Sequence, residues 1–502
     1  MERTKWENRF VLLRFWKKNY MMFLKDLKRF KMERLYDKLK AYSESDFYAF
    51  HMPGHKRNKA LLGIELPYDL DITEIDGFDD LHHADGILKE EQERAARVFG
   101  AEESHFLVNG STAGILSAVM GCTHRGDKIL VARHCHKSIY HAIYMNGLVP
   151  RYVYPEFDIS MHMNGEISKE DVAKALAAEP DIKAVVIVSP NYDGVVSDVK
   201  GIAEVAHSYR IPLIVDEAHG PHFGFHPAFP ECANDLGADV VINSLHKTLP
   251  SLTQTAILHI NGKLANRRRI KKYLDMLQSS SPSYIFMASL DACVDFVDGK
   301  CEEAFELYVE RLQKFREELK PLQHLQILRT EHYDISKVVI STANANITSP
   351  ELADRLRKEY HLEMEMTGGT YVLAMTTVAD TQEGLDRLKS ALLEIDDQLE
   401  AKTAVSGSIE ISGELPRLEQ YFTPQEAADR EEDGEAEEIP WKESEGHISL
   451  EYAYLYPPGS PVIVPGERIS REAVELLCYY ETQNLQIEGI QTEGKIKVWK
   501  HE

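Results

Sequence analysis

The sequence predicts an α/β protein built around a mostly parallel β-sheet, and two features of the chain between residues 104 and 260 predict it. Short apolar runs recur there, and several are separated by segments with helical spacing of apolar residues, such as residues 167–179 and 199–210. The runs are almost entirely apolar, as expected of strands that are covered on both faces of a sheet. Strands that alternate with helices indicate crossover connections, and these connections give parallel pairing.

The elements follow in order from the local patterns. Residues 35–46 have apolar side chains four positions apart and then a polar break, which indicates a short helix. Six apolar runs that end in polar residues, glycine or proline are predicted strands: HFLVNG, KILVA, KAVVIVSP, PLIVDEAHG, DVVINS and TAILHI. A helical pattern, STAGILSAVMG, follows the first of them.

A second, smaller α/β unit is predicted after a mostly helical stretch at residues 264–325. It consists of the strand and helix patterns KVVIST, SPELADRLRKEY, TYVLAMT and TQEGLDRLKSALLEID. Residues 429–438 are acidic and poor in apolar side chains, so we expect a solvated loop there. A segment rich in proline and glycine then precedes a helical pattern, REAVELLCYYETQ. We therefore expect four parts, at residues 1–34, 35–325, 326–400 and 401–502.

The composition limits the classes of function. The 502 residues carry 57 basic and 81 acidic side chains, a net charge of -24. This balance argues against nucleic acid as a partner, because phosphate binding requires a basic surface. The six cysteines form no CxxC pair, so we expect neither a metal site nor a disulfide framework, and reduced thiols indicate the cytoplasm. No apolar run is long enough to cross a membrane.

The first 31 residues differ from the remainder of the chain in being basic and aromatic. Such a segment is able to form an amphipathic helix that lies on a membrane or docks on a partner. The simpler interpretation, which we favour, is an upstream extension before a folded protein that begins near Met32.

The polar residues of interest lie where the predicted strands end, which is where ligands bind in parallel α/β sheets. In VNGSTAG (Val108–Gly114), a glycine turn and the hydroxyl groups of Ser111 and Thr112 begin a helix. Unpaired amides and the helix dipole make such a helix start an anion site. The alternative is ordinary capping of the helix by Ser or Thr, which is common.

Two further strand ends carry ionisable residues of opposite charge. Asp216 ends the run LIVD and either holds a protonated ring nitrogen or caps the next helix. Lys247 follows the run DVVINS. Partial burial there would make the lysine lose its proton more easily, and the unprotonated amine is a nucleophile. Ser244 and His246 beside it are candidate hydrogen-bond donors to a phosphate group. The alternative for Lys247 is a solvated surface residue.

His136, in ARHCHKSIYHA, is able to stack flat on a planar ring, although taken alone it is better explained as a surface histidine. The combination is rarer than any of its members. An anion-binding turn, a histidine, an aspartate and a lysine follow one another at the strand ends of one sheet. These are the parts needed to hold pyridoxal phosphate.

The chain resembles the short form of the pyridoxal-phosphate-dependent ornithine/lysine/arginine decarboxylase family. The matching stretches are FHMPGHKRN, DITEIDGFDDLHHADGILKEEQERAARVFGA, FLVNGSTAGILSAVMG, RHCHKSIYHA, VVIVSPNYDGVVSD, LIVDEAHGPHFGFH, SLHKTLPSLTQTAILH and YPPGSPVIVPGE. The resemblance implies an aspartate aminotransferase-like large domain of fold type I at residues 35–325. A small α/β domain at residues 326–400 and a C-terminal decarboxylase domain at residues 401–502 would follow it.

The same resemblance implies roles for individual residues. Lys247 would form the Schiff base with the cofactor, Asp216 would pair with the pyridine nitrogen, and His136 would stack on the ring. Either Lys247 or His136 would return the proton to the substrate Cα. Two residues expected near the ring and its O3′ oxygen are Ala218 and His219. The residues expected to hold the phosphate group are Ser111, Thr112, Ser244 and His246.

The expected reaction is decarboxylation of a basic amino acid to its amine and CO₂, in polyamine biosynthesis or acid response. Arginine is the first substrate candidate, lysine the second and ornithine the third. A distal cation needs a carboxylate acceptor. Glu467 is the first candidate acceptor and Asp79 and Asp80 are others, with turn capping or solvation as the alternative role for each. An aminotransferase of the same fold and an inactive scaffold are the competing functions, and the resemblance also implies a homodimer or higher homo-oligomer.

Overall fold

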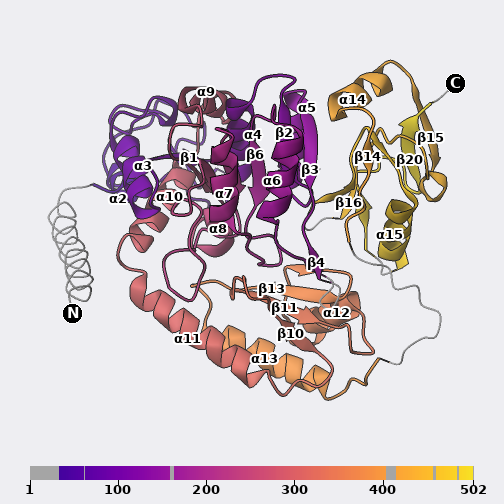
Figure 1. Ribbon diagram of the computed structural model, residues 1–502. Coiled ribbons are helices and arrows are strands. Elements are labelled where there is room, and N and C mark those ends of the chain that lie inside the picture. Colours follow the sequence, from indigo (N-terminus) through magenta and orange to yellow (C-terminus); the bar gives the residue numbers. More distant parts are fainter. Residues whose placement is uncertain are drawn as a thin grey trace, which may run out of the picture. The chain divides into compact units, whose positions relative to one another are not determined.

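Figure 1 shows the computed structural model of the chain, which describes residues 33–61, 63–158, 163–402, 414–455, 459–482 and 485–500. The chain divides into two compact units, of which the first ends at Glu90 and the second begins at Glu91. The basic extension expected before residue 35 lies outside the described residues, apart from its last two positions. The domain boundaries expected near residues 325 and 400 remain predictions.

The first unit contains helix α2 (Leu35–Ser43), the short 3₁₀ helix η1 (Leu81–His83) and the start of α3 (Ile87–Val98). Helix α2 confirms the helix predicted for this segment. Its buried side chains are Leu35 and Leu39, which share one face because they are four positions apart.

A seven-stranded sheet within the described residues belongs to the second unit and has the order β1-β9-β8-β7-β6-β2-β3. Its strands are β1 (Glu103–Leu107), β2 (Lys128–Ala132), β3 (Val149–Val153), β6 (Val185–Val188), β7 (Leu213–Asp216), β8 (Val240–Asn243) and β9 (Ala256–Ile260). All neighbours pair in parallel except β9, which is antiparallel to both β1 and β8. The mostly parallel sheet and its six predicted strands are therefore confirmed, and β3 is an additional strand.

Helices cover both faces of this sheet. Every residue of β6, β7, β8 and β9 is buried, and successive side chains of a strand point to opposite faces. Helix α4 packs against α5 and α9, and α6 packs against α7. The helices between Gly110 and Val297 are α4 (Gly110–Cys122), α5 (Lys137–Met145), α6 (Lys169–Ala178), α7 (Val199–Ser208), α8 (Leu245–Thr248), α9 (Arg267–Leu277) and α10 (Tyr284–Val297). The short strands β4 (Phe157–Asp158) and β5 (Met163–Asn164) pair with each other.

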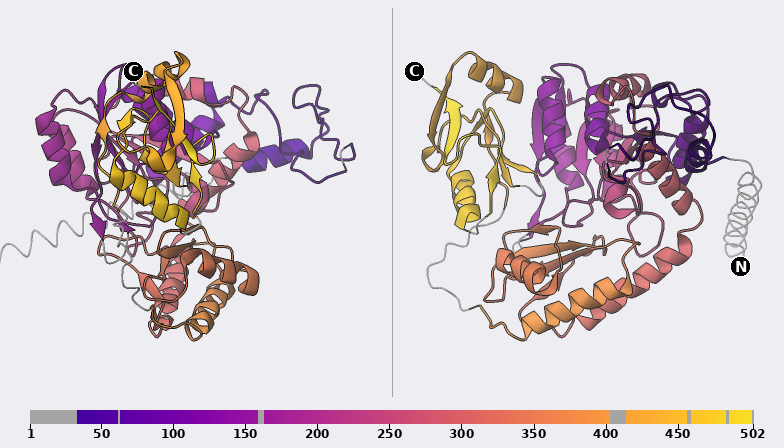
Figure 2. Two further views of the ribbon diagram at one scale, coloured as in Figure 1. Left: turned by 90° about the vertical axis from the view of Figure 1, so that its right-hand side faces the viewer. Right: turned by 180° about the vertical axis from the view of Figure 1, so that it is seen from behind.

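A second sheet has the order β10-β11-β13-β12, and its neighbours pair antiparallel. Its strands are β10 (Gln326–Leu328), β11 (Lys337–Ser341), β12 (Met366–Thr367) and β13 (Tyr371–Met375). The nearby helices are α11 (Glu302–Glu318), α12 (Ser349–Tyr360) and α13 (Gln382–Asp396). Helices α11 and α13 pack against each other, as Figure 2 also shows. The strand and helix patterns predicted for residues 337–396 are confirmed.

The last part of the chain combines short strands with two helices and a 3₁₀ turn. Its elements are β14 (Glu419–Gln420), α14 (Pro424–Glu432), β15 (Ala436–Pro440), η2 (Trp441–Glu443), β16 (Ala453–Leu455), β17 (Pro461–Ile463), β18 (Glu467–Arg468), α15 (Arg471–Thr482), β19 (Ile487–Glu488) and β20 (Lys495–Trp499). Helix α15 confirms the helix predicted after the segment rich in proline and glycine. Across the described part of the chain, every helix is too short or too polar to span a membrane.

The prediction of a solvated loop at residues 429–438 is wrong. The first of these residues complete α14, which Thr423 and Glu426 begin with reciprocal hydrogen bonds. The last of them belong to β15, which pairs with β20 from the end of the chain. Lys497 of β20 lies 2.6 Å from a carboxylate oxygen of Glu431. A basic residue from a strand distant in sequence therefore pairs with one of the acidic side chains of this segment.

Candidate active site

A pocket lies at the carboxyl ends of β6, β7 and β8, where Val188, Asp216 and Ser244 line it. This is the edge of a parallel sheet at which ligands bind. All nine residues predicted to contact the cofactor line the pocket: Ser111, Thr112, His136, Asp216, Ala218, His219, Ser244, His246 and Lys247. The fold thus brings together side chains that are widely separated in the sequence.

One side of the pocket is formed by the start of α4. The hydroxyl groups of Ser111 and Ser244 are hydrogen-bonded to each other, so both face the same point. The side chain of Asn109 does not cap α4, and the first amides of the helix are therefore available to a ligand. A side chain at Gly114 would lie 2.6 Å from Leu107 Cδ1, so this glycine lets the helix sit close to the sheet. The arrangement suits a phosphate group.

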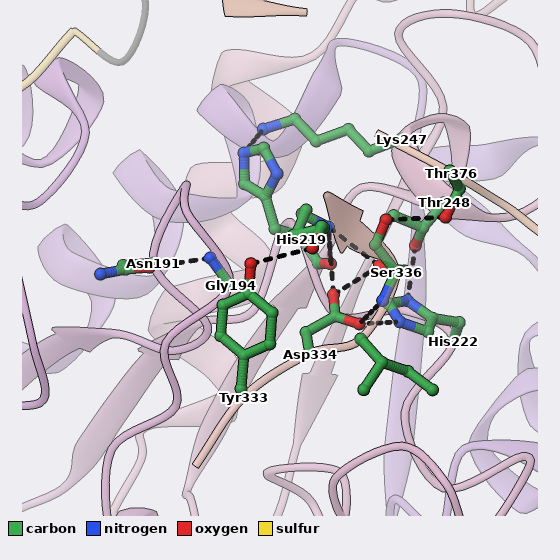
Figure 3. A network of polar contacts seen from close by, with 12 residues as sticks. Asn191, Gly194, His219, His222, Lys247, Thr248, Tyr333, Asp334, Ser336 and Thr376 are labelled. Atoms are coloured by element: carbon green, nitrogen blue, oxygen red, sulfur yellow. Dashed lines mark hydrogen bonds and ion pairs between the residues drawn. The ribbon is translucent and has the colours of Figure 1, made fainter. Parts of the chain in front are cut away.

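Lys247 projects into the pocket from α8, directly after β8. Its Nζ lies 2.8 Å from His219 Nε2, as Figure 3 shows. Burial lowers the pKa of Lys247, the Asp216 carboxylate opposes this effect, and the Lys337 ammonium adds to it. A lysine with a lowered pKa offers an unprotonated amine more readily and is a better nucleophile.

Asp216 is the last residue of β7 and is almost fully buried. Its Oδ1 accepts a hydrogen bond from the Ala218 amide at 3.1 Å. Burial raises the pKa of Asp216, and the Lys247 ammonium and the amide partly counter this. A buried carboxylate of this kind is stabilised when a cationic N–H group binds to it.

His136 precedes α5 and caps it, because its Nδ1 accepts a hydrogen bond from the Ser138 amide at 3.2 Å. Burial lowers the pKa of His136 to about 4, and the nearby ammonium groups of Lys247 and Lys137 act in the same direction. The ring is therefore neutral near pH 7 and presents an uncharged planar surface in the pocket lining.

The two remaining predicted histidines differ in how they are held. His246 Nδ1 donates to the Thr255 carbonyl at 2.8 Å, which leaves Nε2 as its other polar atom. His219 Nε2 contacts Lys247, whereas its buried Nδ1 has no hydrogen-bond partner among the described residues. Burial, followed by the charges of Lys247 and Lys337, lowers the pKa of His219 well below its usual value.

These features match the chemical groups of pyridoxal phosphate. The uncapped start of α4 and the paired hydroxyls of Ser111 and Ser244 suit the phosphate. The buried Asp216 suits the pyridine nitrogen, and Lys247 suits the aldehyde. His219 Nδ1 is a buried polar atom that lacks a partner beside this lysine. The residues present therefore fit the cofactor that the sequence predicts.

The three predicted substrate acceptors have other hydrogen-bond partners in the structure, and their role toward a substrate remains a prediction. The buried Glu467 carboxylate lies 2.9 Å from Arg133 Nη2 and accepts a second hydrogen bond from the Val464 amide. Asp79 accepts hydrogen bonds from the amides of Asp85, Gly86 and Leu88 at the start of α3. Asp80 accepts one from the His82 amide and begins η1. None of the three is among the described residues that line the pocket.

The sequence prediction missed one acidic residue that does line the pocket. Asp193 is buried, and its Oδ1 accepts a hydrogen bond from the Tyr371 hydroxyl of β13 at 2.5 Å. Burial raises the pKa of Asp193 to about 6, although the bond from Tyr371 acts in the opposite direction. The available signal was its position in SPNYDG, directly after a strand end.

Other lining residues also escaped prediction, namely Gly110, Ile115, His134, Asn164, Val188, Asn191, Tyr192 and Ser460. Ser460 comes from the C-terminal part of the chain, and its hydroxyl donates to the His134 carbonyl at 2.7 Å. No local sequence pattern predicts such a contact between distant segments. Among the described residues, no group of three or more histidine, cysteine or acidic side chains is arranged to hold a metal ion.

Two models of protein families match this chain. The model described as Orn/Lys/Arg decarboxylase, major domain, matches residues 33–350. The model described as Orn/Lys/Arg decarboxylase, C-terminal domain, matches residues 413–494.

Individual relatives agree with these matches. The chain is similar to the arginine decarboxylase of Bacillus subtilis (strain 168), with 33% identity over 471 residues that cover 91% of this chain and 95% of the relative. It is 24% identical to the lysine decarboxylase of Pseudomonas aeruginosa, over 86% of this chain and 73% of the relative. The crystal structure of the Francisella novicida lysine decarboxylase shares the fold, with a TM-score of 0.79 at 20% identity over 93% of this chain and 81% of that chain.

Proposed function

The chain belongs to the Orn/Lys/Arg decarboxylase family and is a decarboxylase, and we propose that it converts arginine to agmatine and CO₂ with pyridoxal 5′-phosphate as its cofactor. The observation that carries the proposal is the meeting of Lys247, Asp216 and the uncapped start of α4 in one pocket. A scaffold without activity would have no need of a partly buried lysine with a lowered pKa at this place.

Each part of the pocket has a proposed role toward the cofactor. Lys247 would hold the aldehyde group, Asp216 would hold the pyridine nitrogen in its protonated form, and the neutral ring of His136 would contact the cofactor ring. Ala218 and His219 line the same pocket and would contact the bound cofactor. The residues proposed to bind the phosphate are Ser111, Thr112, Ser244 and His246. His246 needs a proton on Nε2 for this role, because its Nδ1 already donates to the Thr255 carbonyl.

When bound, pyridoxal phosphate supplies an electron sink for the pair left behind as the carboxyl group departs. Asp216 supports this chemistry because a carboxylate beside the ring nitrogen keeps that nitrogen charged. The proton that replaces the carboxyl group must then reach Cα. Lys247 Nζ is the better donor, because a pKa of about 4 leaves His136 without a proton to give near neutral pH. His219 Nε2 holds the Lys247 amine in place at 2.8 Å.

We propose Asp193 as the acceptor of the distal cation of the substrate. Among the described residues that line the pocket, only Asp193 and Asp216 carry a carboxylate, and Asp216 has the ring nitrogen as its partner. The Tyr371 hydroxyl occupies one direction at Asp193 Oδ1, and the second oxygen, Oδ2, has no partner among the described residues. A planar guanidinium group is able to bind a carboxylate with two parallel hydrogen bonds, which an ammonium group cannot do.

The choice of arginine over lysine is supported by the relatives. A relative named arginine decarboxylase is 33% identical over nearly the whole chain, whereas a relative named lysine decarboxylase is 24% identical. Lysine remains the second candidate and ornithine the third. We also propose a cytoplasmic homodimer or higher homo-oligomer that acts in polyamine biosynthesis or acid response. Sedimentation of the purified protein should give at least twice the mass of the chain.

One assay separates the proposed function from its alternatives. The purified protein is loaded with pyridoxal phosphate and given arginine, lysine and ornithine in one mixture, and the amines and CO₂ are quantified. We expect agmatine and CO₂ in equal amounts, with Lys247→Ala as the inactive control. Cadaverine as the main product would identify lysine as the substrate. Transfer of the amino group to an added keto acid without CO₂ release would identify an aminotransferase.

A further inference from the structure

A fully buried lysine, Lys337, lies near Lys247, which is itself only partly buried. Lys337 begins β11, and its side chain and that of Asp334 are both fully inaccessible to solvent. The Lys337 Nζ lies 3.1 Å from Asp334 Oδ2, and it also reaches Ser336 Oγ at 3.4 Å and the His219 carbonyl at 3.4 Å. All three ammonium protons therefore have acceptors. The third acceptor belongs to the residue whose ring contacts Lys247.

Asp334 is the anchor of this network. Its Oδ1 accepts from the Ser336 amide at 2.9 Å and from His222 Nε2 at 3.1 Å, and its Oδ2 accepts from Ser336 Oγ at 2.7 Å. Burial would favour the neutral acid, but Lys337, His222 and Ser336 outweigh it and hold the pKa of Asp334 well below its usual range. A carboxylate with this many donors stays charged and keeps its partners in fixed positions.

The network reaches His219, whose ring contacts the Lys247 amine, and Thr248, which follows Lys247 in the chain. Figure 3 shows Asp334 between His219 and His222. On one side, Lys337 holds the His219 carbonyl, and the His219 ring contacts Lys247 Nζ at 2.8 Å. On the other side, His222 Nδ1 lies 2.9 Å from the hydroxyl of Thr248, the residue that follows Lys247. One carboxylate is thus linked to the ring that contacts the proposed nucleophile and to the residue that follows it in the chain.

The backbone around Lys337 fixes its side chain. Gly194 has a φ of 104° and lies so close that a Cβ there would be 2.8 Å from Lys337 Cγ. The Gly194 carbonyl also accepts a hydrogen bond from the Asp334 amide at 2.8 Å. The Tyr333 hydroxyl donates to the Lys337 carbonyl at 2.8 Å. The ammonium group therefore has little freedom to leave the His219 peptide.

We propose that Lys337, anchored by Asp334, is a positioning residue that fixes His219 against Lys247 and favours the unprotonated amine of Lys247 through its positive charge. The inference deepens the proposed function and rests on it. Burying the Lys337–Asp334 ion pair costs desolvation energy, so the pair is not explained by stability alone. The proposed positioning of His219 gives the pair a function. The other charges that act on Lys247 and His219 are Asp216, His136, Glu365 and Asp334 itself.

The test measures the protonation of Lys247 in the full chain without cofactor. A trace of acetic anhydride labels unprotonated amines, and mass spectrometry follows the labelling of the Lys247 peptide against pH. Replacing Lys337 by Met removes a like charge near Lys247, so the midpoint should move upward. The double variant Asp334→Asn, Lys337→Met leaves no buried charge without a partner and should shift the midpoint in the same direction, even if the single variant folds poorly.

A matched control is Arg94→Met. Arg94 is also buried and lies within 3.6 Å of carboxylate oxygens of Glu91, Asp291 and Asp295, none of which lines the pocket. Its loss should lower stability while the Lys247 midpoint stays at the wild-type value. A midpoint that does not move in the double variant, or that moves equally in Arg94→Met, would overturn the proposal.

The cofactor gives a second readout that is independent of turnover. In protein loaded with pyridoxal phosphate, the pH midpoint of the cofactor absorbance should shift in Lys337→Met and stay in place in Arg94→Met. The labelling result does not require cofactor binding or decarboxylation. A chain that failed to bind pyridoxal phosphate would therefore contradict the proposed function and leave the inference about Lys337 to be decided by the labelling alone.

Discussion

The Asp216 carboxylate favours the protonated form both of Lys247 and of the proposed ring nitrogen, and this makes its role testable at the scale of one residue. Burial lowers the pKa of Lys247, and the Asp216 carboxylate opposes that effect. Asp216→Asn should therefore lower the pKa of Lys247 further, which acetic anhydride labelling measures. The same change should reduce kcat roughly 100-fold or more, because the cofactor nitrogen loses its charged partner. A variant with wild-type kcat would remove Asp216 from the mechanism.

Asp193 gives a prediction about pH. Burial raises its pKa to about 6, and only its ionised form attracts the distal cation of arginine. The KM for arginine should therefore be low above pH 6 and should rise as the pH falls through that value. Asp193→Asn should raise the KM roughly 10-fold to 100-fold at pH 8, with a smaller effect on kcat, and should flatten the pH profile of KM. An unchanged KM would exclude Asp193 as the acceptor.

Tyr371→Phe is the companion variant. The Tyr371 hydroxyl donates to Asp193 and acts to lower its pKa. Without that donor the pKa of Asp193 should rise, so the increase in KM should begin at a higher pH than in the wild type. Steady-state kinetics between pH 5 and 9 measure the shift. An identical profile in the two proteins would show that another group controls substrate binding.

At the scale of single residues, the sequence analysis identified candidate cofactor-binding residues. It missed residues whose importance depends on contacts between distant segments. Asp216, Ser244 and Lys247 are recognisable because polar residues at the ends of apolar strands stand out. Lys337 has no such local signal, and the position of Asp193 shortly after a strand end does not reveal which residue it contacts. Asp193 matters because the small sheet supplies Tyr371, and Lys337 because His219 lies beside it in space. These relations exist only after distant segments have packed.

Between elements, the buried pair of Arg133 and Glu467 links the end of β2 to β18. Arg133→Met would leave the Glu467 carboxylate buried without its partner and should lower the free energy of unfolding by about 3–5 kcal/mol. Urea denaturation measures this loss. Adding Glu467→Leu should recover most of the stability, because two apolar side chains no longer carry a desolvated charge.

The same pair decides between the two roles considered for Glu467. If Glu467 acts structurally, Glu467→Gln should reduce stability while the KM for arginine stays near its wild-type value. A large increase in KM with unchanged stability would instead favour the role of substrate acceptor that the sequence predicts.

Elements were predictable where pattern and burial agree. The core strands are continuously apolar, and helices α12 and α13 show regular apolar spacing. The segment at residues 429–438 was not predictable in this way. Its acidic composition is typical of a loop, although the segment contains the end of a helix and most of a strand. Its pairing partner, β20, lies at the far end of the chain. Tertiary pairing of this kind overrides local composition.

For the whole molecule, the predicted fold class is confirmed, and the family matches cover both the large domain and the C-terminal part. The alternation of strands and helices is a local property and is visible in the sequence. The strand order is not, because β9 enters the sheet between β1 and β8 and runs against both. Similarly, the small sheet contributes Tyr371 to Asp193 and Lys337 to His219, which no single segment reveals.

The central claim is that this pocket holds pyridoxal phosphate on Lys247, and one measurement tests it most directly. The purified protein is incubated with pyridoxal phosphate, treated with borohydride to reduce the carbon–nitrogen double bond, digested and analysed by mass spectrometry. We expect the reduced cofactor on Lys247 alone, and its loss in Lys247→Ala. Attachment to another lysine, such as the buried Lys337, or no specific attachment at all would contradict the account.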